Sequence, residues 1–320
     1  MVLIPKFTEA FLASTPFVEV TAKEVVRQGA VVFEMRNPRL DMIAKALSRP
    51  SAPVVVKLDG WPKKRICSRV FIRIGAQGVG CSLRCLGCDA ADLPGYNLTR
   101  DEMVYQVVHV LASSYVQLRE IKRVTVAFMG TGEPLANPHV ASAIEFLHEM
   151  FRGIGFIVST TGPKRGEDVF NSLMKLVTAK LPIGLQISVP EVIQLKRMVY
   201  TQDRLRGSEL ALCWTLSQLS CRASEFLETT QGQRMAHANL VVAESLADWT
   251  PEEYHELGQK FGPKLCVVKV SPEGKKSSVI LRTKVATRLS AVRSGGWPSY
   301  VYDPIGNGQG LGCASLEILQ

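Results

Sequence analysis

Hydrophobic positions along this chain fall into short runs that are separated by longer segments of mixed polarity. The runs are rich in β-branched and aromatic residues, which predicts strands at about 68–74, 123–129, 155–160, 183–189, 238–242 and 265–270. The longer segments predict helices at about 97–118, 137–152, 164–179, 191–222 and 251–261. Such alternation is typical of βαβ units with a parallel sheet. We therefore expect an α/β fold: a partial (β/α)6 barrel with parallel strands, plus a small N-terminal segment.

Local signals support this reading of the chain. Thr99 and Glu102 have the spacing of a capping box, and Asn137-Pro138 is a typical helix start. In a parallel barrel the chemistry lies at the carboxyl ends of the strands. The cysteine-rich and glycine-rich segments of this chain follow directly after predicted strands, as that rule requires.

The two ends of the chain follow a different pattern. Residues 1–65 show no strong periodicity, and prolines and a glycine divide them into short pieces. The tail beyond residue 275 carries a basic patch and then a glycine-rich stretch around Cys313. We expect an accessory segment at 1–65 and one barrel domain at 66–320, which ends in the tail that bears this cysteine.

Composition narrows the class of protein. Of 320 residues, 46% are hydrophobic and 21% charged, which excludes an intrinsically disordered chain. No run reaches about 18 apolar residues, and the first residues lack the pattern of a signal peptide. We expect a cytoplasmic protein with reduced thiols and no membrane partner. The net charge of +9 indicates an anionic partner such as nucleic acid, or simply a basic soluble protein.

Three of the eight cysteines, Cys81, Cys85 and Cys88, lie within eight residues, with the spacing C-x3-C-x2-C. Thiolates at this density select zinc or an iron–sulfur cluster. A [4Fe–4S] cluster has four irons, so three thiolates leave one iron open to a ligand. A structural zinc site usually has four protein ligands, so the alternative is a zinc knuckle completed by a distant Cys or His.

The spacing, and its place after the first strand of the βα series, resemble the radical S-adenosylmethionine (radical SAM) superfamily. The resemblance implies a [4Fe–4S] cluster and a site for S-adenosyl-L-methionine (SAM). In that context the MGTGEP loop after the second strand fits the amino group of SAM, through Gly132 and Glu133. Ser159 and Ser188, at the ends of the next two strands, are candidates for hydrogen bonds to SAM. The alternative is an ordinary βα turn.

Five segments, MGTGEP, STTG, ISVP, CVVKVSPEG and GLGCASL, follow in this order. Together they resemble the RlmN/Cfr family of radical SAM RNA methyltransferases, over roughly residues 65–320. The resemblance implies methyl transfer to C2 or C8 of an adenine in ribosomal RNA and, for some members, transfer RNA. It implies Cys313 as the methyl carrier, Cys67 as the nearest candidate to resolve the adduct through a disulfide, and Ser271 as a ribose contact. The implied partners are RNA and an electron donor such as flavodoxin or ferredoxin.

The sequence also departs from the pattern of that family. The family's resolving cysteine lies seven residues before the first cluster cysteine, where this chain has Ile74. The family places a glutamate upstream of that cysteine, but no Glu occurs here between Glu34 and Glu102. Two alternatives follow: a radical SAM enzyme acting on a small molecule or peptide without methyl transfer to RNA, and a zinc-containing protein that binds nucleic acid.

Overall fold

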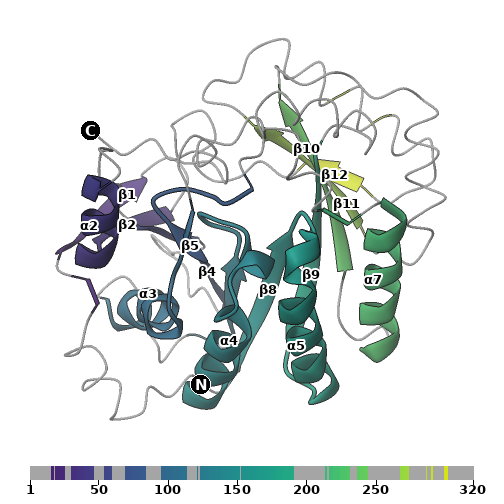
Figure 1. Ribbon diagram of the computed structural model, residues 1–320, viewed down its shortest axis with the longest axis horizontal. Coiled ribbons are helices and arrows are strands. Elements are labelled where there is room, and N and C mark those ends of the chain that lie inside the picture. The colour runs from purple at the N-terminus through teal and green to yellow at the C-terminus, as the bar shows by residue number, and fades with distance from the viewer. Residues whose placement is uncertain are drawn as a thin grey trace.

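A computed structural model gives the architecture of the chain (Figure 1). It describes residues 16–17, 19–25, 30–46, 54–59, 69–83, 95–113, 121, 123–151, 153–190, 213–214, 216–230, 236–243, 267–273, 286, 290 and 299–301. The predicted helix at 251–261, the first part of the one at 191–222 and the basic patch of the tail lie outside this part of the chain. No helix among the described residues is long and apolar enough to span a membrane.

One ten-stranded sheet organises the described residues. In sheet order its strands are β1 (Glu19–Val25), β2 (Ala30–Arg36), β3 (Val54–Asp59), β4 (Arg69–Ile74), β7 (Arg123–Phe128), β8 (Ile154–Thr160), β9 (Ile183–Pro190), β10 (Ala236–Ala243), β11 (Val267–Glu273) and β12 (Ser299–Val301). The strands from β1 to β4 are antiparallel, and those from β4 to β12 are parallel. A second, two-stranded sheet joins β5 (Gln77–Gly78) to β6 (Tyr96–Asn97).

The order of the parallel strands explains the barrel-like shape. Each new strand adds to the same growing edge, and the order never reverses as it does in a doubly wound sheet. Right-handed crossovers then put the described helices that connect these parallel strands on the same face, so the sheet curls around the other face. The helices α3 (Arg100–Ala112), α4 (Val140–Met150), α5 (Glu167–Thr178) and α7 (Leu216–Thr229) contact one another in that order. In Figure 1 the last three stand in a row along the sheet.

This architecture confirms the expected α/β fold with parallel strands. The six strands predicted from the sequence correspond to β4 and β7 to β11, and β12 is a seventh parallel strand that the pattern did not reveal. Strands β1 and β12 lie at the two ends of the described sheet and do not pair with each other, so this sheet is an open partial barrel.

The two predicted helix starts have different outcomes. Thr99 caps α3, accepting from the Glu102 backbone, while the Glu102 side chain accepts from the Thr99 backbone, as the capping box predicts. This helix ends at Ala112, short of the predicted 118, because Ser113 is extended. Asn137 does not begin α4. It closes the short 3-10 turn η3 (Pro134–Ala136), and the helix starts at Val140.

The N-terminal segment is more regular than its sequence suggested. It contributes three strands, β1 to β3, and the helix α2 (Pro38–Ala46). Consecutive residues of β2, Val31, Val32 and Phe33, are all buried, so the strand is covered on both faces and shows no alternation. Strand β3 pairs with β4, so the main sheet runs from this segment into the barrel without a break. The division of the chain near residue 65 stays a prediction.

The two faces of the parallel strands differ in composition. On β7, Val124, Val126 and Phe128 alternate along the face that is fully buried in the hydrophobic core. The opposite face carries mostly small or polar residues, such as Thr125 on β7 and Ser159 on β8, with Phe71 and Ile157 as apolar exceptions. The inside of the partial barrel is therefore the face with hydrogen-bonding groups.

Candidate active site

The carboxyl ends of β4, β7, β8 and β9 lie side by side, because these four strands are parallel neighbours. The segments that leave the first three hold residues 75–83, 129–133 and 161–162. Five of the site residues predicted from the sequence belong to the described part of the chain with their side chains, and all five lie at this edge. They are Cys81, Gly132, Glu133, Ser159 and Ser188.

Cys81 lies just beyond strand β5 and is 8% exposed. The backbone N–H of Leu83 donates to its Sγ at 3.5 Å. A backbone donor of this kind stabilises negative charge on the sulfur, which suits a thiolate ligand. Within the described part of the chain no three His, Cys, Asp or Glu side chains come together, and Cys85, Cys88, Cys67 and Cys313 lie outside it.

Backbone hydrogen bonds join the loop after β4 to the loop after β7. The carbonyl oxygen of Thr131 accepts from the N–H groups of Ala76 and Gln77, at 2.9 and 3.0 Å. The N–H of Gly130 donates to the carbonyl of Ile74 at 3.0 Å. The cysteine-bearing loop and the glycine loop therefore form one unit.

Gly132 is required for this close approach. Its φ is +94°, a conformation that L side chains rarely adopt. A Cβ at this position would lie 2.4 Å from the Cβ of Gln77 and 2.8 Å from its backbone nitrogen. The second glycine of MGTGEP thus lets the two loops touch, which is a packing reason for its presence.

Glu133 is buried and binds the loop after β8. Its Oε1 accepts from the Leu135 N–H and the Thr160 hydroxyl, and its Oε2 accepts from the N–H and the hydroxyl of Thr161. Burial raises the pKa of Glu133 above its ordinary value, and these hydrogen bonds act in the opposite direction. Four donors already occupy its carboxylate, so its demonstrated role is to hold the STTG segment. A contact of Glu133 with the amino group of SAM stays a prediction.

Ser159 and Ser188 come together on the inner face of the partial barrel. Their hydroxyl oxygens are 3.3 Å apart, and the amide of Gln186 donates to Ser159 at 2.9 Å. Ser271 lies on β11, where its backbone pairs with Val241 of β10. The hydroxyls on β8 and β9 therefore form one polar group at the carboxyl edge.

Comparisons with known proteins bear on these residues. Residues 77–212 match the family model described as the radical SAM superfamily. The chain contains a radical SAM domain. Members of this superfamily use a [4Fe–4S] cluster and SAM, which favours an iron–sulfur centre over the zinc alternative. The matched segment spans the cysteine triplet, the glycine loop and the polar group of β8 and β9.

One solved structure resembles the fold over nearly the whole chain. A radical SAM methyltransferase from Sphaerobacter thermophilus superposes with a TM-score of 0.67 at 20% identity, covering 98% of this chain and 86% of that chain. SuiB from Streptococcus suis has a TM-score of 0.46 at 12% identity, covering 74% of this chain and 49% of that chain. No curated protein sequence matches this chain.

The radical SAM domain described here fits its cofactors in two respects. Three thiolates are the donor set expected for a cluster with one open iron, and the first of them, Cys81, lies at the active edge of the sheet beside a backbone donor. The glycine loop at 130–132 is hydrogen-bonded to the loop that carries Cys81, so both loops reach the same edge.

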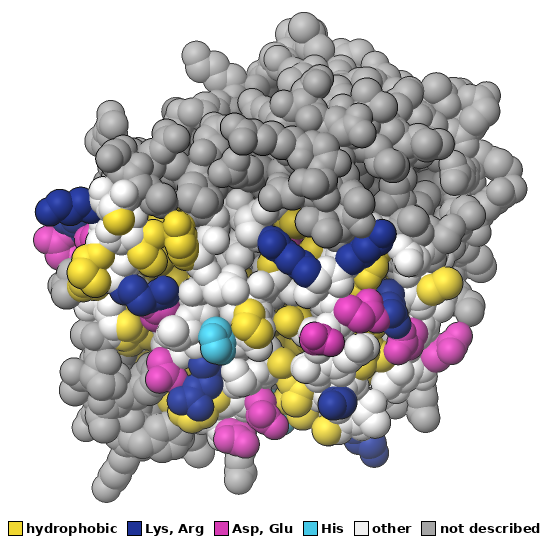
Figure 2. All heavy atoms as spheres, viewed as in Figure 1, with side chains coloured by type: hydrophobic (Ala, Val, Ile, Leu, Met, Phe, Trp, Pro, Cys, Tyr) yellow, Lys and Arg dark blue, Asp and Glu magenta, His cyan; other side chains and the backbone are white. Residues whose placement is uncertain are grey.

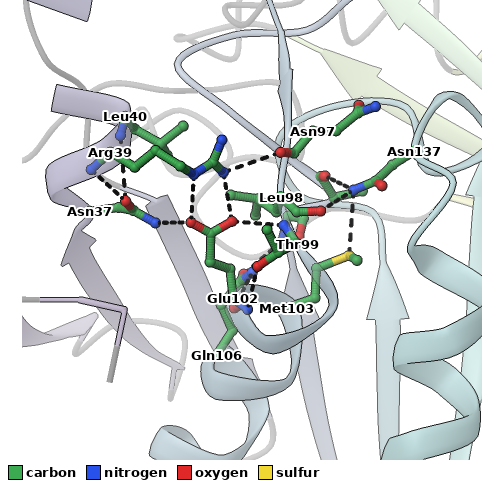
Figure 3. Close-up of polar contacts among 12 residues, drawn as sticks. Asn37, Arg39, Leu40, Asn97, Leu98, Thr99, Glu102, Met103, Gln106 and Asn137 are labelled. Carbon is green, nitrogen blue, oxygen red and sulfur yellow. Dashed lines mark hydrogen bonds and ion pairs between the residues drawn. The ribbon is translucent and has the colours of Figure 1, made fainter. Parts of the chain in front are cut away.

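Three buried amide side chains support the site, and the sequence analysis assigned none of them this role. Gln106 on α3 accepts from the N–H of Gly75 and donates to its carbonyl oxygen. Asn137 donates to the carbonyl oxygens of Ala76 and Leu98 (Figure 3). Gln77 is the third. Isolated Gln and Asn residues carry no sequence signal, because partners such as Asn97 for Gln77 and Ala76 for Asn137 lie 20 and 61 residues away along the chain.

A second buried glutamate, Glu102, ties the N-terminal segment to α3 (Figure 3). Arg39 binds both carboxylate oxygens, at 3.0 and 2.6 Å, and Asn37 and the Thr99 N–H donate as well. Burial alone would raise the pKa of Glu102, but the hydrogen bonds and the charge of Arg39 outweigh it and lower the pKa. This junction fixes α2 against the first helix of the barrel.

Proposed function

We propose that this protein is a radical SAM methyltransferase that transfers a methyl group from SAM to an adenine carbon of RNA. The observation that carries the proposal is the order of the cysteine triplet, the MGTGEP segment and the STTG segment along the chain. Cys81, the MGTGEP loop and the STTG segment lie at one edge of the sheet. The fold likeness to a methyltransferase and the family resemblance of the motifs support the same reaction.

In this proposal each described residue has a defined task. Cys81, with Cys85 and Cys88, holds the cluster, and the backbone at 130–132 lies against SAM. Glu133 keeps the STTG segment in place from inside, and the hydroxyls of Ser159 and Ser188 face the ligand. When bound, the cluster and SAM supply a 5′-deoxyadenosyl radical at this edge.

The methyl group travels through a cysteine. The thiolate of Cys313 accepts a methyl group from one SAM molecule, which leaves as S-adenosylhomocysteine. With a second SAM bound, radical chemistry would remove one hydrogen atom from that methyl group as 5′-deoxyadenosine forms, and its carbon would bond to the adenine carbon, which loses its proton while one electron leaves to the cluster. Cys67 would then attack the Cys313 sulfur, so that the carbon–sulfur bond breaks as the disulfide forms and a proton completes the new methyl group. RNA and a reductant such as flavodoxin or ferredoxin are the proposed partners, and the cytoplasm is the proposed location.

The net positive charge of the chain agrees with RNA as a partner but does not identify a binding surface. The chain has nine more basic than acidic residues. Among the described residues on the face shown in Figure 2, however, Lys and Arg side chains lie among Asp and Glu side chains and form no continuous basic patch. Phosphate contacts are therefore expected on other parts of the protein, such as the basic tail at 275–293.

A second candidate is a radical SAM enzyme that modifies a small molecule or peptide. Position 74, where the RlmN/Cfr family has its resolving cysteine, holds Ile74 at the end of β4. This side chain is fully buried in the core, in register with Phe128. A residue so placed takes no part in resolving an adduct, so this position favours the second candidate unless Cys67 acts instead.

The cluster is tested with a matched pair of cysteines. Cys81 and Cys213 are both buried, each 8% exposed. We expect Cys81→Ala to lose the cluster iron, acid-labile sulfide and reductive cleavage of SAM, while Cys213→Ala retains all three. Iron and sulfide in the Cys81→Ala protein at the level of Cys213→Ala would remove the cluster from this site.

The substrate is tested by incubating the anaerobically prepared protein with SAM, a reductant and RNA. Mass spectrometry of RNA digests is expected to show a methyladenosine, and Cys313→Ala to abolish it. Release of 5′-deoxyadenosine without any methyladenosine would reject RNA methylation and leave the second candidate.

A further inference from the structure

Gln77 lies where the cysteine-bearing loop after β4 meets the glycine loop after β7, at the carboxyl edge of the parallel strands. It is 1% exposed and pairs in the small β5–β6 sheet with Asn97, to which its side-chain amide nitrogen donates at 2.7 Å. That contact fixes the orientation of the amide. The amide oxygen, Oε1, is thereby turned toward the cysteine-bearing loop and the glycine loop.

The oxygen of Gln77 accepts hydrogen bonds from both of those loops. Ser82, the residue after Cys81, donates its backbone N–H at 3.1 Å and its hydroxyl at 3.2 Å. Glu133, 56 residues further along the chain from Gln77, donates its backbone N–H at 3.3 Å. One atom therefore holds the residue next to a cluster ligand and the residue that anchors the STTG segment.

The packing around Gln77 permits little adjustment. A Cβ on Gly132 would collide with its Cβ and Cγ, and a Cβ on Gly95 would lie 2.7 Å from Oε1 and 2.5 Å from the Ser82 nitrogen. Glycines thus enclose the side chain on two sides. Losing its oxygen would leave two buried or half-buried N–H groups without an acceptor.

We propose that Gln77 is a positioning residue that couples the cluster loop to the SAM loop. Because Oε1 bonds both loops, a displacement of Cys81 is transmitted to the backbone at Glu133, and the reverse also holds. The proposal rests on the radical SAM domain and is independent of the molecule that receives the methyl group.

The first test needs neither cluster nor activity. Amide hydrogen exchange of the cluster-free protein is compared between wild type and Gln77→Met, which keeps the length and removes both the acceptor and the nitrogen that donates to Asn97. We expect exchange at Ser82 and Glu133 to be about tenfold faster, with the amides of Ile144 and Leu147 in α4 unchanged. Acceleration at only one of the two amides would overturn the coupling.

Matched variants separate positioning from general support. Gln106→Met removes another buried glutamine, which bonds Gly75 and neither of the two loop amides. It is expected to speed exchange at Gly75 alone. Gln77→Glu keeps an oxygen acceptor and loses the nitrogen that donates to Asn97, whose own amide can turn to donate to the second carboxylate oxygen. This variant is therefore expected to restore protection at both Ser82 and Glu133.

The second test uses the cluster-loaded protein. We expect Gln77→Met to weaken SAM binding by about tenfold and to reduce the change that SAM produces in the electron paramagnetic resonance signal of the reduced cluster. Gln77→Glu restores both, and Gln106→Met, which loosens only the Gly75 end of the cysteine-bearing loop, has a smaller effect on both than Gln77→Met. Should Gln77→Met not fold, Ser82→Ala removes one of the three bonds and is expected to weaken SAM binding by about threefold. Wild-type SAM affinity in the folded variant would overturn the proposal, whether or not RNA is methylated.

Discussion

Two buried glutamates hold two different regions of this protein, and their surroundings give them opposite properties. Glu102 joins the N-terminal segment to α3, and Glu133 joins the glycine loop to the STTG segment. Each carboxylate accepts four hydrogen bonds. Arg39 supplies a full positive charge to Glu102, whereas the hydrogen-bond donors of Glu133 are all neutral.

The charge of these donors determines the direction in which the pKa of each glutamate shifts. With a cation beside it, the Glu102 carboxylate has a lowered pKa and forms a permanent ionic junction. Without one, burial raises the pKa of Glu133. At the candidate active site, hydroxyls and backbone N–H groups therefore hold the Glu133 carboxylate. At the junction with the N-terminal segment, the Arg39 salt bridge holds the Glu102 carboxylate.

The largest expected loss of stability comes from a substitution beside Glu133 that displaces the glycine loop and leaves the Glu102 junction untouched. Gly132→Ala adds a Cβ 2.4 Å from that of Gln77, at a φ of +94°. We expect the free energy of unfolding to fall by about 4 kcal/mol, measured by urea denaturation. Gly155→Ala is the control, since its Cβ meets nothing closer than 3.6 Å, and should change stability by less than about 1 kcal/mol.

The next effect tests the Glu102 junction. In Glu102→Gln, the new amide group faces two donors whichever way it turns, one from Arg39 and one from Asn37 or Thr99. We expect a loss of about 3 kcal/mol in the free energy of unfolding. A loss below that of the Glu133 variant described next would contradict the distinction between the two glutamates.

Glu133→Gln is expected to cost less stability, about 1 kcal/mol. The new amide can donate to the hydroxyl of Thr160 or Thr161, which then acts as acceptor, so only one backbone N–H loses its partner. The same denaturation experiment measures this variant. Its SAM affinity, measured separately by calorimetry, reports whether the carboxylate also contacts the ligand.

The pH dependence of stability should differ in sign between the two glutamates. The lowered pKa of Glu102 means that its contribution is present above the unfolded pKa and lost as pH falls through the folded one. For Glu133, with a raised pKa, the contribution is lost as pH rises through the folded value. Between about pH 7 and pH 4, the stability gap between wild type and Glu102→Gln should shrink on acidification, and that for Glu133→Gln should grow. Parallel changes in both gaps would refute this.

The smallest effect is expected from an exposed ion pair of the N-terminal segment. Arg36 contacts Asp41 at 3.2 Å, and the arginine side chain is half exposed. Asp41→Asn should change the free energy of unfolding by less than about 0.5 kcal/mol, because solvent screens the pair. A loss comparable to that of Glu102→Gln would mean that burial is not what distinguishes the junction.

Local sequence patterns were sufficient for much of the fold and for part of the site. The capping box at Thr99 and Glu102 and the short apolar strands depend on neighbouring residues, and the structure confirms them. The placement of Cys81 and the MGTGEP loop at one edge follows from the rule that parallel strands end together. The strands of the N-terminal segment were missed because β2 is buried on both faces and shows no alternation.

The sequence by itself determined the order of the parallel strands β4 and β7 to β11, the cysteine triplet and the glycine loop, since each is encoded within a few neighbouring residues. Only the tertiary structure decided which groups meet: Arg39 with Glu102 across 63 residues, and Gln77 with Ser82 and Glu133. It also decided the sign of each pKa shift. Burial and long-range partners set these properties, and neither is written in the local pattern of the chain.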